Sequence, residues 1–151
     1  MFKRNQIISV SLVLVLLTIF YTNAPASDVE FKKAANSFLK DIHKKGFYLV
    51  DPEEVNNLIE SNQDIYILDV RTPYEVSMGR IPGAVSIRLN ALMENLEELP
   101  ENEEKPIYVY CRNAIRSAYA TAILRVFGYS EVFNISGGFK AWEDEGYPVT
   151  K

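Results

Sequence analysis

Apolar residues along the chain form two kinds of pattern, continuous runs and helical spacing. The continuous runs lie at residues 65–70, 84–87, 106–110 and 132–135. Runs of this kind are typical of strands in a sheet that is covered on both faces. Between the runs, apolar positions recur every three or four residues. That spacing predicts helices near residues 74–78, 91–99 and 116–127, and a last short helix that contains Trp142 and ends at Gly146.

Two elements are expected before the first of these strands. Residues 28–45 have apolar positions at helical spacing and predict an amphipathic helix. Residues 48–50 predict a short strand. Asp51 and Pro52 then mark the start of another helix, because proline is favoured at the first helical position.

Strands that alternate with helices favour right-handed crossovers and a parallel sheet. We therefore expect one three-layer α/β/α domain with a central, mainly parallel sheet of about five strands. In such sheets, ligands bind beyond the carboxyl ends of the strands. Cys111 directly follows the strand predicted at residues 106–110, so it is expected at this binding edge.

The N-terminus has the order of features of a secretory signal. Lys3 and Arg4 precede an apolar stretch at residues 7–21, and Ala24-Pro25-Ala26 offers a cleavage site. We expect residues 1–26 to be a signal peptide and the protein to be exported, to a periplasm. The alternative is a retained membrane anchor that faces outside the cytoplasm. Residues 27–46 would then be a helical extension, and residues 47–151 the main domain.

Composition narrows the classes of function. The chain has 151 residues with 48% hydrophobic and 24% charged residues, which fits one globular domain. Its formal net charge of −4 argues against nucleic acid as a partner, because phosphate binding needs a basic surface. A single cysteine and a single histidine allow no disulfide within the chain and make a metal site improbable.

The segment around the only cysteine carries the candidate chemistry. A short loop between a strand and a helix can turn backbone N–H groups inward, and the helix N-terminus adds its positive dipole end. Arg112 and Arg116 place two cations near Cys111. We therefore predict that the pKa of the Cys111 thiol lies below the value of about 8.5 for a free thiol. The same loop would hold an anionic sulfur donor or a persulfide.

Residues 65–149 resemble a rhodanese domain. The resemblance rests on four blocks in the family's order: residues 68–73 with Glu75, residues 79–84, the loop from Cys111 to Arg116, and the ending at residues 137–149. It implies that Cys111 is the nucleophile and persulfide carrier, and that Arg116 closes the loop. It further implies that no cofactor is needed and that Asp69 and Arg71 brace loops by ion pairing. The implied substrate-binding residues are Arg112, Asn113, Ala114 and Ile115.

The implied activity is transfer of sulfane sulfur from a thiosulfate-like donor to a thiophilic acceptor. Because the chain has no second thiol, cyanide, a small thiol or a protein cysteine must discharge the persulfide. One alternative is a binding or sulfur-delivery module without turnover of small molecules. A phosphatase or arsenate reductase is disfavoured, because the loop from Cys111 to Arg116 spans six residues and the loop of those enzymes is one residue longer.

Two residues depart from the family pattern. Ala114 stands where a glycine is common, and a left-handed alanine costs about 1–2 kcal/mol. Arg80 stands where the family often has a histidine, and we interpret it as a surface arginine.

Overall fold

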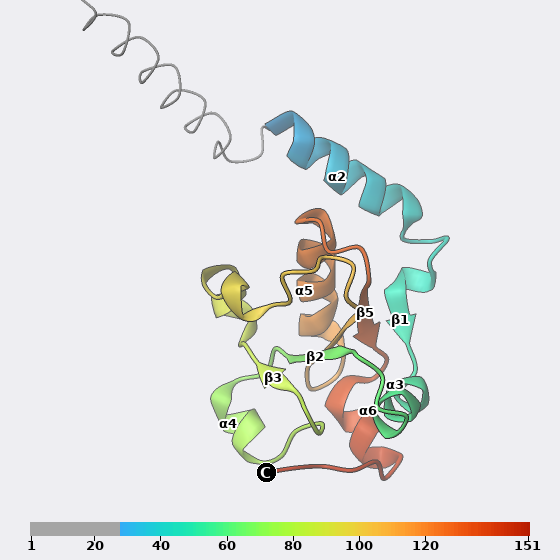
Figure 1. Ribbon diagram of the computed structural model, residues 1–151, viewed down its shortest axis with the longest axis vertical. Coiled ribbons are helices and arrows are strands. Elements are labelled where there is room, and N and C mark those ends of the chain that lie inside the picture. The colour runs from blue at the N-terminus through green and yellow to red at the C-terminus, as the bar shows by residue number, and fades with distance from the viewer. Residues whose placement is uncertain (1–27) are drawn as a thin grey trace, which may run out of the picture. The chain divides into compact units, whose positions relative to one another are not determined.

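The computed structural model describes residues 28–151, so the expected signal at residues 1–26 lies outside the described residues. Five strands form one sheet in the order β1-β5-β4-β2-β3, and every neighbouring pair is parallel (Figure 1). This arrangement confirms the predicted α/β class. The strands are β1 (Leu49–Val50), β2 (Tyr66–Asp69), β3 (Val85–Ser86), β4 (Ile107–Tyr110) and β5 (Val132–Ile135).

Helices precede the first strand and connect the later ones. The α-helices are α2 (Asp28–Asp41), α3 (Pro52–Glu60), α4 (Pro73–Ser77), α5 (Ile115–Val126) and α6 (Gly138–Asp144), and the 3₁₀-helices are η1 (Gly46–Tyr48), η2 (Leu89–Glu94) and η3 (Leu96–Glu98). Among the described residues, none of these helices is long and apolar enough to cross a membrane.

One predicted element was wrong. The helix expected at residues 91–99 is instead the pair of 3₁₀-helices η2 and η3. Asn95 separates them with a φ of −134°, and its side-chain amide donates to the carbonyl of Ala91. A side chain that bonds the local backbone competes with the helical hydrogen bonds, which explains the interruption.

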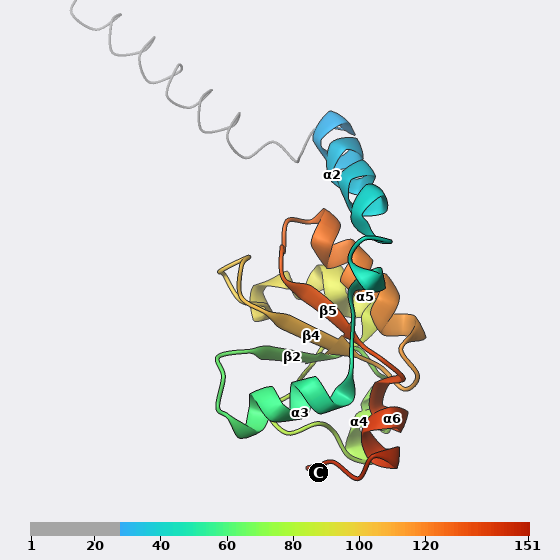
Figure 2. The same ribbon diagram turned by 90° about the vertical axis from the view of Figure 1, so that its right-hand side faces the viewer.

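Side chains of β4 alternate between two hydrophobic cores, one on each face of the sheet. Ile107 and Val109 join the core that includes Leu124 of α5, whereas Tyr108 and Tyr110 join the second core. That second core also holds Val55 of α3 with Phe139 and Trp142 of α6. Figure 2 shows α3 and α6 on one face of the sheet and α5 on the other. Successive strand residues point to opposite faces, so a fully apolar strand builds three layers.

A buried ion pair fixes the chain where β2 ends. The Arg71 guanidinium donates to both carboxylate oxygens of Asp69 at 2.6–3.0 Å, and neither side chain is more than 1% exposed. Arg71 also donates to the carbonyl of Gly79 at 2.7 Å and lies 4.0 Å from the centre of the Phe139 ring. The pair therefore ties the segment after α4 to the sheet and to α6, which is the bracing role expected for these residues.

Removing one partner of this pair should be costly, because the other is left as an uncompensated buried charge. We expect Asp69→Ala to lower the free energy of unfolding by about 3–5 kcal/mol in urea titrations. Asp64→Ala is the matched control, since Asp64 forms an ion pair with Lys105 while its side chain is 88% exposed. The control should cost at most about 1 kcal/mol. Equal losses in the two variants would contradict a structural role for the buried pair.

Candidate active site

The loop after β4 wraps around the thiol of Cys111. Cys111 is 0% exposed, and the loop leads directly into α5. Backbone N–H groups of Asn113, Arg116 and Ser117 donate toward its sulfur, and the Ser117 hydroxyl lies 3.5 Å from it. The sulfur therefore sits in a cradle of hydrogen-bond donors at the carboxyl end of a central strand, where the sequence placed it.

The cradle exists because the loop carbonyls are held on its outer side. The N–H groups of Phe139 and Lys140 in α6 donate to the carbonyls of Cys111 and Arg112, at 2.8 and 3.0 Å. The side-chain amide of Asn134 in β5 donates to the carbonyl of Ala114 at 3.1 Å. In a trans peptide the C=O and the following N–H point in opposite directions. Holding the Arg112 carbonyl outward therefore turns the N–H of Asn113 toward the sulfur. The N–H groups of Arg116 and Ser117 are donors of the first turn of α5, which have no partner within the helix.

Gly138 allows α6 to come this close. A Cβ atom at this position would lie 2.5 Å from the carbonyl oxygen of Cys111 and 2.8 Å from the backbone nitrogen of Ala114. Its φ of +63° also favours glycine. In the sequence, residue 138 was singled out only as part of the ending at residues 137–149 that resembles the rhodanese family. Gly138 packs directly against the cysteine loop. This is a tertiary contact, which the local sequence did not reveal.

Ala114 adopts the left-handed conformation that the sequence raised as a possibility, with φ 66° and ψ −3°. A glycine would take this conformation at lower cost. The hydrogen bond from Asn134 and the first helical bond, from the N–H of Ala118, both end on the Ala114 carbonyl. These two bonds hold the strained residue in place at the start of α5.

Arg116 closes the loop through α4. Its guanidinium donates to both carboxylate oxygens of Glu75, at 2.6 and 2.8 Å. The same carboxylate caps α4 by accepting from Thr72. The Arg116 hydrogen bonds, which outweigh the opposing effect of burial, together with those from Thr72, lower the pKa of Glu75 to about 2. The pair thus stays charged at all but strongly acidic pH, and Arg116 also interacts with the Cys111 sulfur.

Arg112 differs from the prediction that both arginines act on the thiolate. Its side chain is 54% exposed, and Nη1 pairs with Glu143 of α6 at 3.3 Å. Arg112 thus contributes its carbonyl to the seating of the loop, while its charge is directed at α6. Asn113 contributes its backbone N–H to the cradle, and the side chains of Asn113 and Ile115 are exposed.

The direction of the predicted pKa shift is confirmed, and its cause lies mainly in hydrogen bonds. Burial alone would raise the pKa of the Cys111 thiol. The Ser117 hydroxyl and the backbone N–H groups of Ser117, Asn113 and Arg116 together outweigh burial, so the pKa is lowered. The loop therefore favours the nucleophilic thiolate.

Ser117 and Asn134 form a buried hydrogen-bonded pair next to the Cys111 sulfur. The Asn134 amide nitrogen donates to Ala114, which leaves its Oδ1 to accept from the Ser117 hydroxyl at 2.6 Å. That hydroxyl has one proton, so it donates either to Asn134 or to the sulfur. Sequence reasoning assigned no role to either residue. The available signal was a single polar residue, Asn134, within the otherwise apolar run at residues 132–135.

Within residues 28–151, no three His, Cys, Asp or Glu side chains lie close enough together to hold a metal ion. Trp142 is fully buried and its indole N–H donates to the carbonyl of Pro148, so it is a core residue.

Residues 51–145 match the model of the rhodanese-like domain, which covers more than half of the chain. The chain therefore belongs to the rhodanese-like domain family. It is similar to a sulfurtransferase of Allochromatium vinosum, with 32% identity over 100 residues that cover 66% of this chain and 92% of that protein. Among solved structures, it resembles a rhodanese-related protein of Thermoplasma volcanium, with a TM-score of 0.60, 30% identity, and coverage of 67% of this chain and 95% of the other.

A tRNA uridine(34) hydroxylase of Acinetobacter baumannii is also similar, with 28% identity over 141 residues. The match covers 85% of this chain but only 45% of the hydroxylase. Sulfurtransferases and a tRNA hydroxylase thus both contain sequences related to this domain.

The role of Ser117 can be tested through the ionisation of the thiol. Ser117→Ala removes the first of the groups that lower the pKa of Cys111, while burial, which raises it, remains. The midpoint of the pH dependence of iodoacetamide alkylation should therefore move to higher pH. Ser130→Ala, which removes an exposed hydroxyl far along the chain from the loop, should leave the midpoint unchanged. An unchanged midpoint in Ser117→Ala would show that the backbone N–H groups suffice.

Proposed function

We propose that this protein is a sulfurtransferase in which Cys111 carries the transferred sulfur as a persulfide. The observation that carries the proposal is the thiol of lowered pKa inside a loop whose N–H groups converge on its sulfur. Such a cradle suits a thiolate, and it equally suits the negatively charged terminal sulfur of a persulfide. The sulfurtransferase among its relatives supports the same class of reaction.

The first half of the reaction loads the sulfur. The Cys111 thiolate attacks the sulfane sulfur of a thiosulfate-like donor, and a new S–S bond forms. The donor's own S–S bond breaks, and its electron pair leaves with sulfite. The negative charge that began on Cys111 leaves with sulfite, and the terminal sulfur of the persulfide keeps the negative charge that it carried in the donor, so no proton transfer or cofactor is required.

The second half passes the sulfur on. A thiolate or cyanide attacks the terminal sulfur, the Cys111 S–S bond breaks, and the cysteine thiolate is restored. The chain has no second cysteine, so this nucleophile comes from outside it. The Ser117 hydroxyl can turn from Asn134 to the sulfur and support the thiolate that leaves. The signal-like order of residues 1–26 supports the proposal that the reaction takes place outside the cytoplasm.

A second candidate is a sulfur-delivery or binding module, and one observation favours it. Cys111 is 0% exposed, so a donor reaches the sulfur only when the residues that cover it move apart. A protein partner that opens the loop would then control transfer. Detectable turnover with small donor and acceptor molecules alone separates the sulfurtransferase from this module.

The test is intact mass spectrometry of the full-length chain after exposure to thiosulfate. We expect a gain of one sulfur atom that cyanide removes, with one thiocyanate released per sulfur lost. Cys111→Ser should show no gain. Arg112→Gln serves as a matched control, because its exposed guanidinium pairs with α6, and it should still be loaded.

The outcomes divide the candidates clearly. A cyanide-labile sulfur on the wild type and Arg112→Gln, and none on Cys111→Ser, would support the proposed transfer. A free Cys111 thiol in folded protein with no added sulfur would contradict thiosulfate-type transfer and favour the module. Sulfur that persists in Cys111→Ser would contradict the role of the cysteine.

A further inference from the structure

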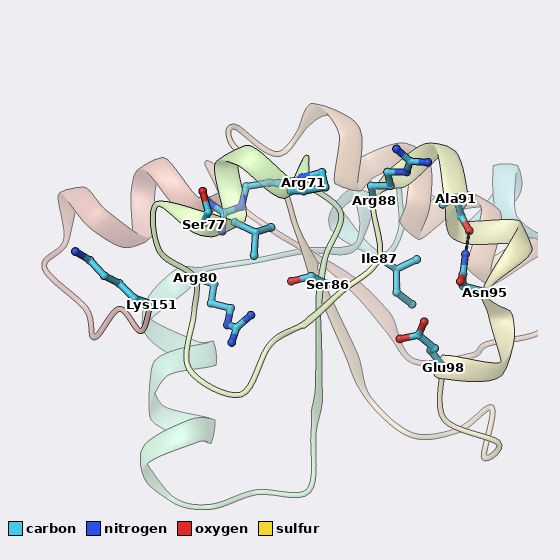
Figure 3. Close-up of a pocket in the computed structure, with 12 residues that line it drawn as sticks. Arg71, Ser77, Arg80, Ser86, Ile87, Arg88, Ala91, Asn95, Glu98 and Lys151 are labelled. Carbon is cyan, nitrogen blue, oxygen red and sulfur yellow. Dashed lines mark hydrogen bonds between the residues drawn. The ribbon is translucent and has the colours of Figure 1, made fainter.

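A pocket of about 440 Å³ lies outside the cysteine loop, since none of residues 111–116 lines it. Its walls come from α4, from the end of β3 and from η2. Figure 3 shows Ser86 and Ile87 at its centre, with Ser77 of α4 on one side and, on the other, Ala91 of η2 and Asn95, which follows it. The pocket thus lies at the carboxyl end of a strand, the edge where parallel sheets bind ligands.

The lining combines apolar surface with arginine. Val76, Ile87 and Ala91 supply apolar side chains, and Arg80 supplies a half-buried guanidinium group. Arg88 also lines the pocket, but its side chain is exposed and points away from Arg80 in Figure 3. Glu98 is the one carboxylate among the lining side chains, and Figure 3 shows it apart from Arg80. The volume is within the range of about 300–1,000 Å³ typical of small-molecule sites.

The two arginines have no partner for their charge within residues 28–151. All the ion pairs in this part of the chain involve other cations. Arg71 also lines the pocket, but Asp69 neutralises it, and the Lys151 ammonium points outward in Figure 3. Two unpaired arginines in one pocket are notable in a chain whose formal net charge is −4.

Arg80 needs a different interpretation from the one its sequence position suggested. Its side chain is half-buried rather than fully on the surface, and it lines the pocket. Its backbone is fixed by reciprocal hydrogen bonds with Thr150, at 2.8 and 2.9 Å. The backbone that bears the Arg80 side chain is therefore fixed. The guanidinium lines the pocket and forms no ion pair with a carboxylate of residues 28–151.

We propose that this pocket binds a small organic monoanion with an apolar body, such as a carboxylate or sulfonate. Arg80 would attract the anionic group, and Val76, Ile87 and Ala91 would cover the apolar part. Glu98 disfavours a second negative charge on the ligand, because like charges repel at short range. The proposal concerns binding and stands independently of sulfur transfer at Cys111.

The probe for this test is benzoate, added to the full-length chain and followed by methyl and amide NMR. We expect saturable shifts at Val76, Ile87 and Ala91. Removing one partly exposed ion pair should weaken binding about two- to five-fold in Arg80→Gln. Glu98→Gln should strengthen it, because a repulsive charge is lost. Lys45→Gln removes an exposed, unpaired cation outside the pocket and should leave binding unchanged.

Two uncharged or inorganic probes complete the design. Benzyl alcohol has the ring without the charge, and sulfate has the charge without the ring, so both should bind more weakly than benzoate. Equal binding of benzyl alcohol, equal binding of sulfate, or saturable shifts that lie away from the pocket would each overturn the proposal. Equal weakening in Lys45→Gln and Arg80→Gln would also overturn it, since only net charge would then matter.

Discussion

The site depends on the hold that α6 and Asn134 have on the carbonyls of the cysteine loop. Three loop carbonyls, those of Cys111, Arg112 and Ala114, accept hydrogen bonds from donors outside the loop. Peptide planarity then turns the N–H of Asn113 toward the sulfur, and the first turn of α5 supplies the free N–H groups of Arg116 and Ser117. Burial disfavours a thiolate, and these N–H groups with the Ser117 hydroxyl reverse that preference. Gly138 has no Cβ atom, and this absence lets α6 approach closely enough to hold the loop.

Two ion pairs extend this hold to the neighbouring loops. Arg116 links the start of α5 to Glu75 of α4, and Arg71 links the end of β2 to the segment after α4. The Arg71 guanidinium also stacks on Phe139, the residue whose N–H bonds the Cys111 carbonyl. The loops after β2, β4 and β5 are therefore joined at one edge of the sheet. Such mutual support fits a site whose geometry must be set before the substrate arrives.

Much of the fold was predictable because it follows from local patterns. Apolar runs located β2, β4 and β5, and the position of Cys111 after β4 placed the nucleophile at the binding edge. The helix predicted at residues 91–99 was wrong because helical spacing cannot reveal the hydrogen bond by which the Asn95 side chain interrupts the helix. Ser117, Asn134 and Gly138 were missed because their roles depend on contacts between elements that are distant in sequence. Arg112 was misjudged for the same reason, since its partner Glu143 lies on α6.

The central claim is that backbone N–H groups of the loop stabilise the anionic sulfur. A pH titration of the full-length chain, followed by ¹H–¹⁵N NMR, tests it directly. The amide protons of Asn113, Arg116 and Ser117 should move downfield together as Cys111 ionises, with one midpoint below that of a free thiol, and should not move in Cys111→Ser. Amide signals that stay unchanged while the thiol ionises would contradict the account and assign the lowered pKa to the Ser117 hydroxyl instead.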